Sequence, residues 1–267
     1  MPVVTDPYQP GTPCWVDLMA SDQQAALDFY RDLFGWQGEV GPADFGGYSV
    51  CMLNDRPVAG IMAAVAPSGS NVAPSVAWTT YLASDDADES NRAIAAAGGT
   101  ILYEPMDVGT IGRMMVAADP TGAVFGVWQA MDFIGAGVVN EPGALVWNEL
   151  NTADTEAAAR FYRPALGLRP ATIQGMDGYF SFNVADRTVG GMQPIPGYLA
   201  PGTPSHWMTY FSVDDTDSTV DALVKAGGSV IQPPFDMQSG RMSVVQDPQG
   251  AVFAVVQAPD TQLPDSP

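Results

Sequence analysis

Short runs of alternating apolar and polar residues dominate the chain, and stretches with helical spacing separate them. In residues 14–20 the alternation places Trp15 and Asp17 on one side of an expected strand, and Cys14 and Leu18 on the other. Similar strand-like runs follow at 47–53, 57–64, 76–83, 100–103, 112–118 and 123–129. The pattern predicts a sheet-rich half-chain in which each strand turns one face toward a core.

Two helices are expected between these strands. Ser21, with Gln24 three residues later, fits a capping box; apolar residues then recur at helical spacing, and Gly35 ends the first helix. The second helix begins in the acidic run at Asp85, where carboxylates suit the helix dipole, and it stops at Gly98. The expected order is strand, helix and two strands, a further strand, then a helix and three strands.

The second half of the chain repeats the first. Trp15 returns as Trp147, and the segment Asp119-Pro-Thr-Gly-Ala-Val-Phe125 returns as Asp247-Pro-Gln-Gly-Ala-Val-Phe253. This period is far longer than the roughly 20–50 residues of a solenoid repeat, so it indicates a duplicated domain. We expect domains at 12–130 and 144–258, a linker at 131–143, and tails at 1–11 and 259–267. Pro164 is expected to end or kink the matching helix of the second copy early.

Composition narrows the class of protein. The chain has 267 residues and a formal net charge of −20, which disfavours binding to nucleic acids and to anionic membranes. No apolar run reaches 18 residues and the N-terminus does not resemble a signal peptide, so we expect a cytoplasmic protein. Two cysteines cannot form a disulfide framework. Nine Arg to one Lys, with abundant Ala, Gly and Pro, indicates a high-GC genome, and the acidic charge is also what an actinobacterial-type protein needs for solubility alone.

Several motifs occur in the same order in both copies and carry a resemblance. They are Phe29-Tyr30-x-x-x-Phe34-Gly35, Asp85-Asp86, Ala97-Gly98-Gly99 and Asp119-Pro-x-Gly122, matched by Phe161-Tyr162-x-x-x-Leu166-Gly167, Asp214-Asp215, Ala226-Gly227-Gly228 and Asp247-Pro-x-Gly250. The chain resembles the vicinal oxygen chelate (VOC) superfamily, which includes glyoxalase I, extradiol dioxygenases and bleomycin-resistance proteins. The resemblance implies an α+β fold of two tandem domains. Each would hold two paired βαβββ modules that curl a mixed or antiparallel sheet into a cup around a small molecule, with the helices outside.

The resemblance also implies where a metal would be held, and this chain departs from the pattern there. The expected ligand positions are occupied by Trp15, Thr79 and Gly126 in the first copy, and by Trp147, Met208 and Ala254 in the second. Indole and thioether are poor ligands for a hard divalent ion, and the chain contains a single histidine, His206. We therefore expect neither a metal nor another cofactor.

Aromatic residues, methionines and two acids are the candidate ligand-binding residues, and no catalytic residue is assigned. Strand alternation places Trp15 beside Asp17 and Trp147 beside Glu149, a pairing that suits a flat ligand bearing a positive charge. The full set is Trp15, Asp17, Tyr48, Trp78, Met114, Trp147, Glu149, Tyr179, Trp207 and Met242. Trp78 and Trp207 are equally consistent with a place in the core. Arg113 and Arg241 are expected to pair with nearby acids or, alternatively, to reach a ligand carbonyl.

Three functions are compatible with these residues. The favoured hypothesis is a metal-free protein that binds or sequesters a hydrophobic aromatic metabolite or antibiotic, in secondary metabolism or self-resistance. The alternative is a metal-independent isomerase, lyase or hydroxylase-associated enzyme that uses Asp17 or Glu149 as its acid or base. A third is a protein that associates weakly with a pathway enzyme. Because two fused copies supply their own pairing, we expect a monomer.

Overall fold

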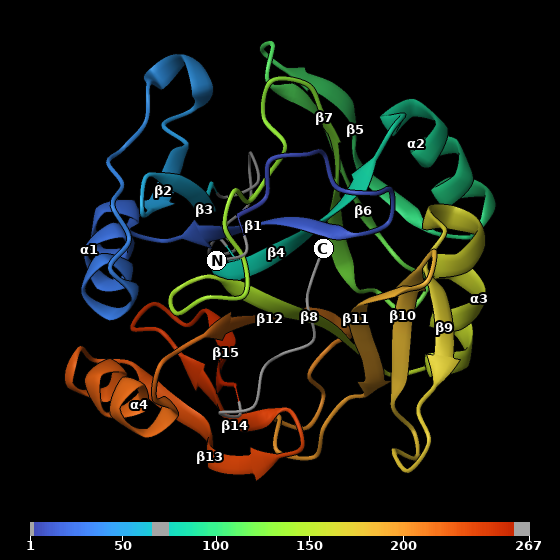
Figure 1. The fold of residues 1–267 in the computed structure, drawn as a ribbon. Helices are drawn as coiled ribbons and strands as arrows, with labels where there is room; N and C mark the ends of the chain where they lie inside the picture. The colour runs from blue at the N-terminus through green and yellow to red at the C-terminus, as the bar shows by residue number, and fades with distance from the viewer. Residues whose placement is uncertain (1–2, 66–74, 259–267) are drawn as a thin grey trace.

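Each copy of the repeat forms one mixed sheet, as predicted. The computed structural model describes residues 3–65 and 75–258. The first copy has seven strands in the order β2-β3-β1-β4-β7-β6-β5, and the second has eight in the order β13-β14-β15-β12-β8-β11-β10-β9 (Figure 1). The strands of the first copy are β1 (Pro13–Ala20), β2 (Ser49–Leu53), β3 (Arg56–Ala63), β4 (Ala77–Ser84), β5 (Thr100–Val108), β6 (Gly112–Ala118) and β7 (Val124–Ala130). Those of the second are β8 (Leu145–Thr152), β9 (Arg169–Thr172), β10 (Phe180–Val184), β11 (Arg187–Pro194), β12 (His206–Ser212), β13 (Ser229–Met237), β14 (Gly240–Gln246) and β15 (Val252–Gln257).

Two modules build each sheet and meet at its centre. In the first copy β1 pairs in parallel with β3, and β4 pairs in parallel with β7, while β1 and β4 join the modules in antiparallel register. The second copy repeats this with β8, β11, β12 and β15. The second copy has an extra strand, β9, which pairs with β10. The matching place in the first copy has an isolated β-bridge between Gln37 and Met52. The expected paired-module architecture is therefore confirmed.

In the described part of the chain, each of the four α-helices has an aspartate as its N-cap residue. The helices are α1 (Gln23–Phe34), α2 (Ala87–Ala96), α3 (Thr155–Leu166) and α4 (Thr216–Lys225), with a short 3₁₀ turn, η1 (Ala43–Phe45), after α1. Asp22 caps α1 by accepting a hydrogen bond from the Ala25 N–H at 3.0 Å, so the predicted capping box at Ser21 and Gln24 is wrong. A carboxylate cap also interacts favourably with the helix dipole, which a serine cannot do.

Helix α3 continues through Pro164 to Leu166 and ends at Gly167, which adopts the left-handed conformation. The expected early break is therefore wrong. Proline removes the N–H that would bond to the carbonyl four residues earlier, that of Arg160. Because Arg160 is exposed, water can solvate that carbonyl and the loss is small.

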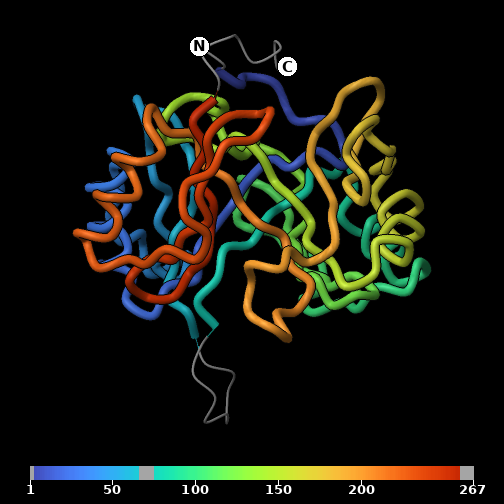
Figure 2. Tube along the Cα trace, turned by 90° about the horizontal axis from the view of Figure 1, so that it is seen from below, coloured from blue at the N-terminus to red at the C-terminus, as the bar shows by residue number. Residues whose placement is uncertain are grey.

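The core lies between the two copies. Helices α1 and α4 lie together at one end of the molecule, and α2 and α3 lie together at the other (Figure 1). Phe34 of the first copy packs against Phe211 and Phe253 of the second, and Phe125 packs against Tyr162. Figure 2 shows the first and last thirds of the chain interleaved at one side of the molecule. Each copy thus completes the hydrophobic core of the other.

The repeated Asp-Pro-x-Gly turn takes part in this interface. One oxygen of Asp247 accepts the backbone N–H groups of Gln249 and Ala251, at 2.8 and 2.9 Å. Its other oxygen accepts the hydroxyl of Tyr30 from the first copy, at 3.0 Å. A single carboxylate therefore holds its own turn and joins the two copies.

The segment before β1 and the linker pack together. The backbone N–H of Val4 donates to the Gly137 carbonyl at 3.1 Å, and the Tyr8 hydroxyl donates to the Ala136 carbonyl at 2.7 Å. Residues 3–11, expected as a tail, are thus tied to the linker, whereas the expected tail at 259–267 lies outside the described residues. Cys14 and Cys51 are buried free thiols. None of the helices in the described part of the chain is long and apolar enough to cross a membrane.

The contact between the copies can be tested at Tyr30. Changing Tyr30→Phe removes the hydroxyl that donates to one Asp247 oxygen and accepts from the Trp78 indole, leaving that oxygen and the indole N–H buried without this partner. We expect the free energy of unfolding to fall by about 1–3 kcal/mol, measured by urea denaturation. Tyr103→Phe is the matched control, because Tyr103 is 63% exposed. Equal unfolding curves for both variants would contradict this role of Tyr30.

Candidate functional site

Trp15 and Asp17 lie on one face of the first sheet, as predicted from their alternation in β1. The register of β1 with β4 sets Trp15 beside Tyr81 and Asp17 beside Thr79. In the same way, Trp147 lies beside Tyr210 and Glu149 beside Met208 in the second sheet. We call these two surfaces the Asp17 face and the Glu149 face. Each lies on the opposite side of its sheet from Leu18 or Leu150, respectively.

The Asp17 carboxylate is the centre of the first face. It is only 4% exposed, and one of its oxygens accepts the hydroxyls of Tyr81 and Tyr48, at 2.9 and 3.3 Å. The Tyr48 hydroxyl in turn accepts the indole N–H of Trp15 at 2.7 Å. Three of these residues were expected together, and Tyr81 was missed as a partner because it comes from the neighbouring strand.

The Glu149 face repeats this arrangement. Glu149 is also 4% exposed and accepts the Tyr210 hydroxyl at 2.7 Å and the amide of Gln193 at 2.6 Å. The Trp147 indole donates to the Tyr179 hydroxyl at 3.2 Å. The structure therefore joins Trp147, Glu149 and Tyr179 as predicted, and adds Tyr210 and Gln193. We call Trp15, Asp17, Tyr48 and Tyr81, and their counterparts Trp147, Glu149, Tyr179 and Tyr210, the two quartets.

Glycines make room for the tyrosines of the quartets. A Cβ atom on Gly60 would overlap the hydroxyl of Tyr48, and one on Gly191 would overlap that of Tyr179. A Cβ atom on Gly126 would overlap the ring of Tyr81. These glycines lie in strands, where the residue type is normally unfavourable, so their positions signal a close approach of this kind.

Burial changes the acidity of both carboxyls. It raises the pKa of Asp17 from 3.8 to about 7, and the hydrogen bonds donated by Tyr81 and Tyr48 only partly oppose this shift. Burial also raises the pKa of Glu149, against hydrogen bonds from Tyr210, Tyr179 and Gln193. The tyrosine hydroxyls cannot release their protons near neutral pH, because burial and the adjacent carboxylates raise the pKa of each. Asp17 therefore exchanges a proton near pH 7.

The side chains on these faces do not fit a divalent metal ion. Trp15, Thr79 and Gly126 do share the Asp17 face, as the resemblance implies for metal-ligand positions, but indole and glycine supply no ligand atom, and the Thr79 hydroxyl is a weak ligand that cannot replace them. Nowhere in residues 3–65 and 75–258 do three His, Cys, Asp or Glu side chains gather as ligands would. His206 lies on the Glu149 face, where one ring nitrogen is 3.3 Å from the Asn151 amide and the other is 2.8 Å from the Pro204 carbonyl. Each face thus offers a single carboxylate, already engaged with hydroxyl groups.

Trp78 and Trp207 lie away from the quartets. The register sets Trp78 beside Leu18 and Trp207 beside Leu150, on the opposite faces of the sheets from Asp17 and Glu149. Their indoles donate to the hydroxyls of Tyr30 and Tyr162 in the shared core. Their expected place in the ligand pocket is therefore wrong, and the core alternative holds.

The remaining candidates divide between the faces and the surface. Met114 and Met242 pair with Trp128 and Val256, which places them on the Asp17 and Glu149 faces. Arg113 forms ion pairs with Asp88 and Asp107, at 3.0 and 2.8 Å. Arg241 pairs in the same way with Asp217 and Asp236. The two arginines thus bind acids, as favoured from the sequence, instead of facing the quartets.

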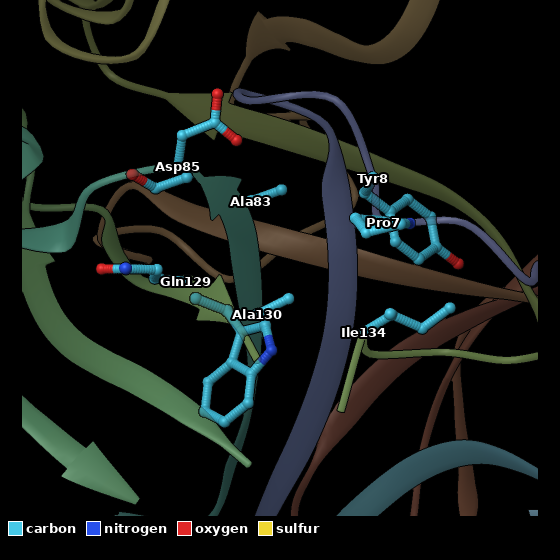
Figure 3. A pocket seen from close by; sticks show the side chains of 9 residues that line it. Pro7, Tyr8, Ala83, Asp85, Gln129, Ala130 and Ile134 are labelled. Carbon is cyan, nitrogen blue, oxygen red and sulfur yellow. The ribbon is translucent and has the colours of Figure 1, made fainter. Parts of the chain in front are cut away.

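Two hollows adjoin the Asp17 face. One, of about 530 Å³, is lined by Tyr48, Val50 and Met52 together with the segment from Gln37 to Pro42. The other, of about 190 Å³, lies between Tyr8 and Ile134 on one side and Ala83, Asp85 and Gln129 on the other (Figure 3). The linker residue Phe133 packs edge-on against Trp15, with ring centroids 4.9 Å apart. Trp15 is consequently covered by the chain itself, and Tyr48 is the member of its quartet that lines a hollow.

Asp17 should make the stability of the protein depend on pH. Between about pH 4 and pH 7 the folded protein holds a proton on Asp17 that the unfolded chain has released, so stability falls as pH rises through this window. We expect Asp17→Asn to remove this component, which is at most about 4 kcal/mol for a shift of this size. Urea denaturation at pH 4, 5.5 and 7 measures it, with the exposed Asp44→Asn as control. Parallel pH dependences of the wild type and Asp17→Asn would contradict the assignment.

Comparison with known proteins agrees with this geometry. A family model described as Glyoxalase/Bleomycin resistance protein/Dioxygenase superfamily matches residues 14–127 and 144–255. "Putative glyoxylase CFP32" of Mycobacterium tuberculosis (strain CDC 1551 / Oshkosh) is 43% identical over 254 residues, covering 93% of this chain and 95% of its own. The anthracycline biosynthesis protein DnrV of Streptomyces peucetius is 38% identical over 264 residues, with 94% of each chain covered. The Mn(II)-bound glyoxalase from Novosphingobium aromaticivorans shares the fold, with a TM-score of 0.65 at 17% identity, over 93% of this chain and 82% of its own. The chain therefore belongs to the glyoxalase, bleomycin resistance protein and dioxygenase superfamily, of which it carries two tandem domains.

Proposed function

We propose that this protein binds a small, hydrophobic aromatic molecule on the quartet faces without the help of a metal ion. The observation that carries the proposal is the quartet itself, which stands in both copies where a metal site would otherwise lie. It presents aromatic rings, hydroxyl groups and one shielded carboxyl, which are groups that recognise organic molecules. The net charge of −20 favours neutral or cationic ligands over anions.

The hollow beside Tyr48 supports the proposal. Its volume of about 530 Å³ falls in the range of small-molecule sites, and apolar side chains from β2 form one wall. Tyr48 connects this hollow to the buried Asp17 through its hydroxyl. The relative DnrV is named as an anthracycline biosynthesis protein, and a polycyclic aromatic compound belongs to the ligand class that such a surface suits.

Native mass spectrometry tests the binding. The protein is treated with EDTA, incubated with an extract of metabolites from its host and transferred to the gas phase under gentle conditions. We expect one or two adducts per chain whose mass equals that of a compound in the extract, and no gain when Mn²⁺ or Ni²⁺ is added. Adducts that form only after a divalent ion is restored would contradict metal-free binding.

A second function is favoured by the acidity of Asp17. A buried carboxyl with a pKa of about 7 can accept or return a proton at neutral pH, which is the requirement for a general acid–base residue. On this alternative, the protein is a metal-independent enzyme of the isomerase or lyase type. Tyr81 and Tyr48 would hold the carboxylate in place while it accepts a proton from the substrate.

The enzyme alternative makes a separate prediction. The molecule that binds should be consumed and released with an altered mass or isomeric form, and Asp17→Asn should lower turnover at least about 100-fold while binding remains. Liquid chromatography with mass detection measures both the loss and the product. The matched variant Glu149→Gln is measured in the same way, and the variant that loses turnover identifies the copy that carries out the reaction. Turnover that survives in both variants would exclude the two carboxyls from the chemistry.

A further inference from the structure

The Asp17 and Glu149 faces differ at three matched positions. Next to Asp17, the strand registers bring together Met19, Met62 and Ala77. The same three positions next to Glu149 hold Asn151, Gln193 and His206. At these three positions the first copy therefore has apolar side chains, and the second copy has side chains that can form hydrogen bonds.

The polar side chains on the Glu149 face form a chain of hydrogen bonds with a fixed direction. The amide nitrogen of Gln193 donates to Glu149 at 2.6 Å and to the side-chain oxygen of Asn151 at 3.2 Å. Nδ1 of His206 lies 2.8 Å from the Pro204 carbonyl, which can only accept, so Nδ1 carries the proton. Nε2 then accepts from the Asn151 amide at 3.3 Å, and burial lowers the pKa of His206, which keeps the ring neutral.

This arrangement presents one hydrogen-bond acceptor to a ligand. Both amide hydrogens of Gln193 are used within the chain, so the group left to it is the side-chain oxygen. Gln193 and His206 are partly exposed, whereas Glu149 is buried beneath them. An acceptor held in this way selects a ligand that carries a hydroxyl or N–H group.

The two tryptophans differ in what covers them. Phe133 packs on Trp15 and also on Trp128, and its backbone N–H is fixed by the Ile111 carbonyl at 3.0 Å. Trp147 is partly exposed and packs at its edge against the cluster that contains Tyr210, and among the described residues its ring has no contact of the kind that Phe133 makes with Trp15.

We propose that the Glu149 face is the ligand-binding face and that it takes a planar aromatic molecule bearing a hydroxyl group. The ring lies against Trp147, as Phe133 lies against Trp15, and the hydroxyl donates to the Gln193 side-chain oxygen. Tyr198, which packs against the apolar cluster of this face, borders the same site. The Asp17 face is filled at its tryptophan by the chain's own phenylalanine. This inference rests on the proposed binding function and assigns it to one copy and one ligand class.

The test uses the full chain and three fluorescent probes: 2-naphthol, 2-methoxynaphthalene, which lacks the donor hydrogen, and naphthalene. We expect 2-naphthol to bind about five- to tenfold more tightly than the other two, as one hydrogen bond allows. Gln193→Met, which introduces the residue of the first copy, should remove this preference and leave naphthalene binding unchanged. Trp147→Ala should weaken all three probes about tenfold or more.

Matched variants of the first copy are the controls. Met62→Gln and Phe133→Ala, which change the Asp17 face, should leave the affinity for 2-naphthol as in the wild type. Thermal melts followed by circular dichroism check the folding of each variant, and Gln193→Met keeps the test decisive if Trp147→Ala is unstable. The result that supports the inference is a loss confined to variants of the second copy.

Other outcomes separate this inference from the proposed function. If 2-naphthol binds but is weakened only by Phe133→Ala or by Met52→Ala in the hollow beside Tyr48, the ligand lies on the first copy and the inference is overturned. If metabolite adducts form but none of the three probes binds, the ligand class is wrong, while metal-free binding stands. If neither probes nor metabolites bind, both proposals fall.

Discussion

The shared core between the two copies is the constraint on which the positions of the candidate sites depend. Phe34, Phe211 and Phe253 meet across the copies, so each sheet must turn one face inward to bury these rings. Because side chains alternate along a strand, the residues between the inward ones must point outward. Asp17 and Glu149 stand at such positions, one residue away from the core residues Leu18 and Leu150. Packing between the copies therefore places the Asp17 face and the Glu149 face on the sides of the two sheets opposite Leu18 and Leu150.

Burying a carboxyl on each outer face has consequences for its neighbours. Removing an ionised group from water is unfavourable, and the protein responds both by raising its pKa and by supplying hydrogen-bond donors. The donors are tyrosine hydroxyls, whose length allows them to reach across from adjacent strands. A tyrosine that crosses a strand needs space above the backbone, which only glycine leaves open at Gly60 and Gly191. The acid, the tyrosines and the glycines thus form one dependent unit.

Much of this unit could be read from the sequence, because alternation within β1 and β8 places each tryptophan beside an acid. The duplicated modules followed in the same way from motifs that recur in order. The partners from neighbouring strands, Tyr81 and Tyr210, could not be derived, since local pattern carries no register between strands. The missing register also explains why Trp78 was placed among the ligand-binding candidates. Its side of the sheet is set by its pairing with Leu18, which the local pattern does not reveal. The early helix end expected at Pro164 was wrong because the free-energy cost of a proline within a helix depends on the carbonyl four residues earlier. That cost is small when water can solvate this carbonyl.

The positions at which the two copies differ are explained by the dependence of the acid, the tyrosines and the glycines on one another. A change in the acid, a quartet tyrosine or its glycine leaves a buried group unpaired or overlapping, which costs about 1–3 kcal/mol or more. Both copies accordingly have an acid, two tyrosines and a glycine next to the first tyrosine (Gly60 and Gly191), whereas Gly126 next to Tyr81 is replaced by Ala254 next to Tyr210. Met62 and Gln193 are partly exposed, so either residue type can be accommodated at that matched position without disturbing the unit beneath. Packing therefore restricts the residue types at the buried centre of each face, whereas partly exposed positions such as these can differ between the two copies.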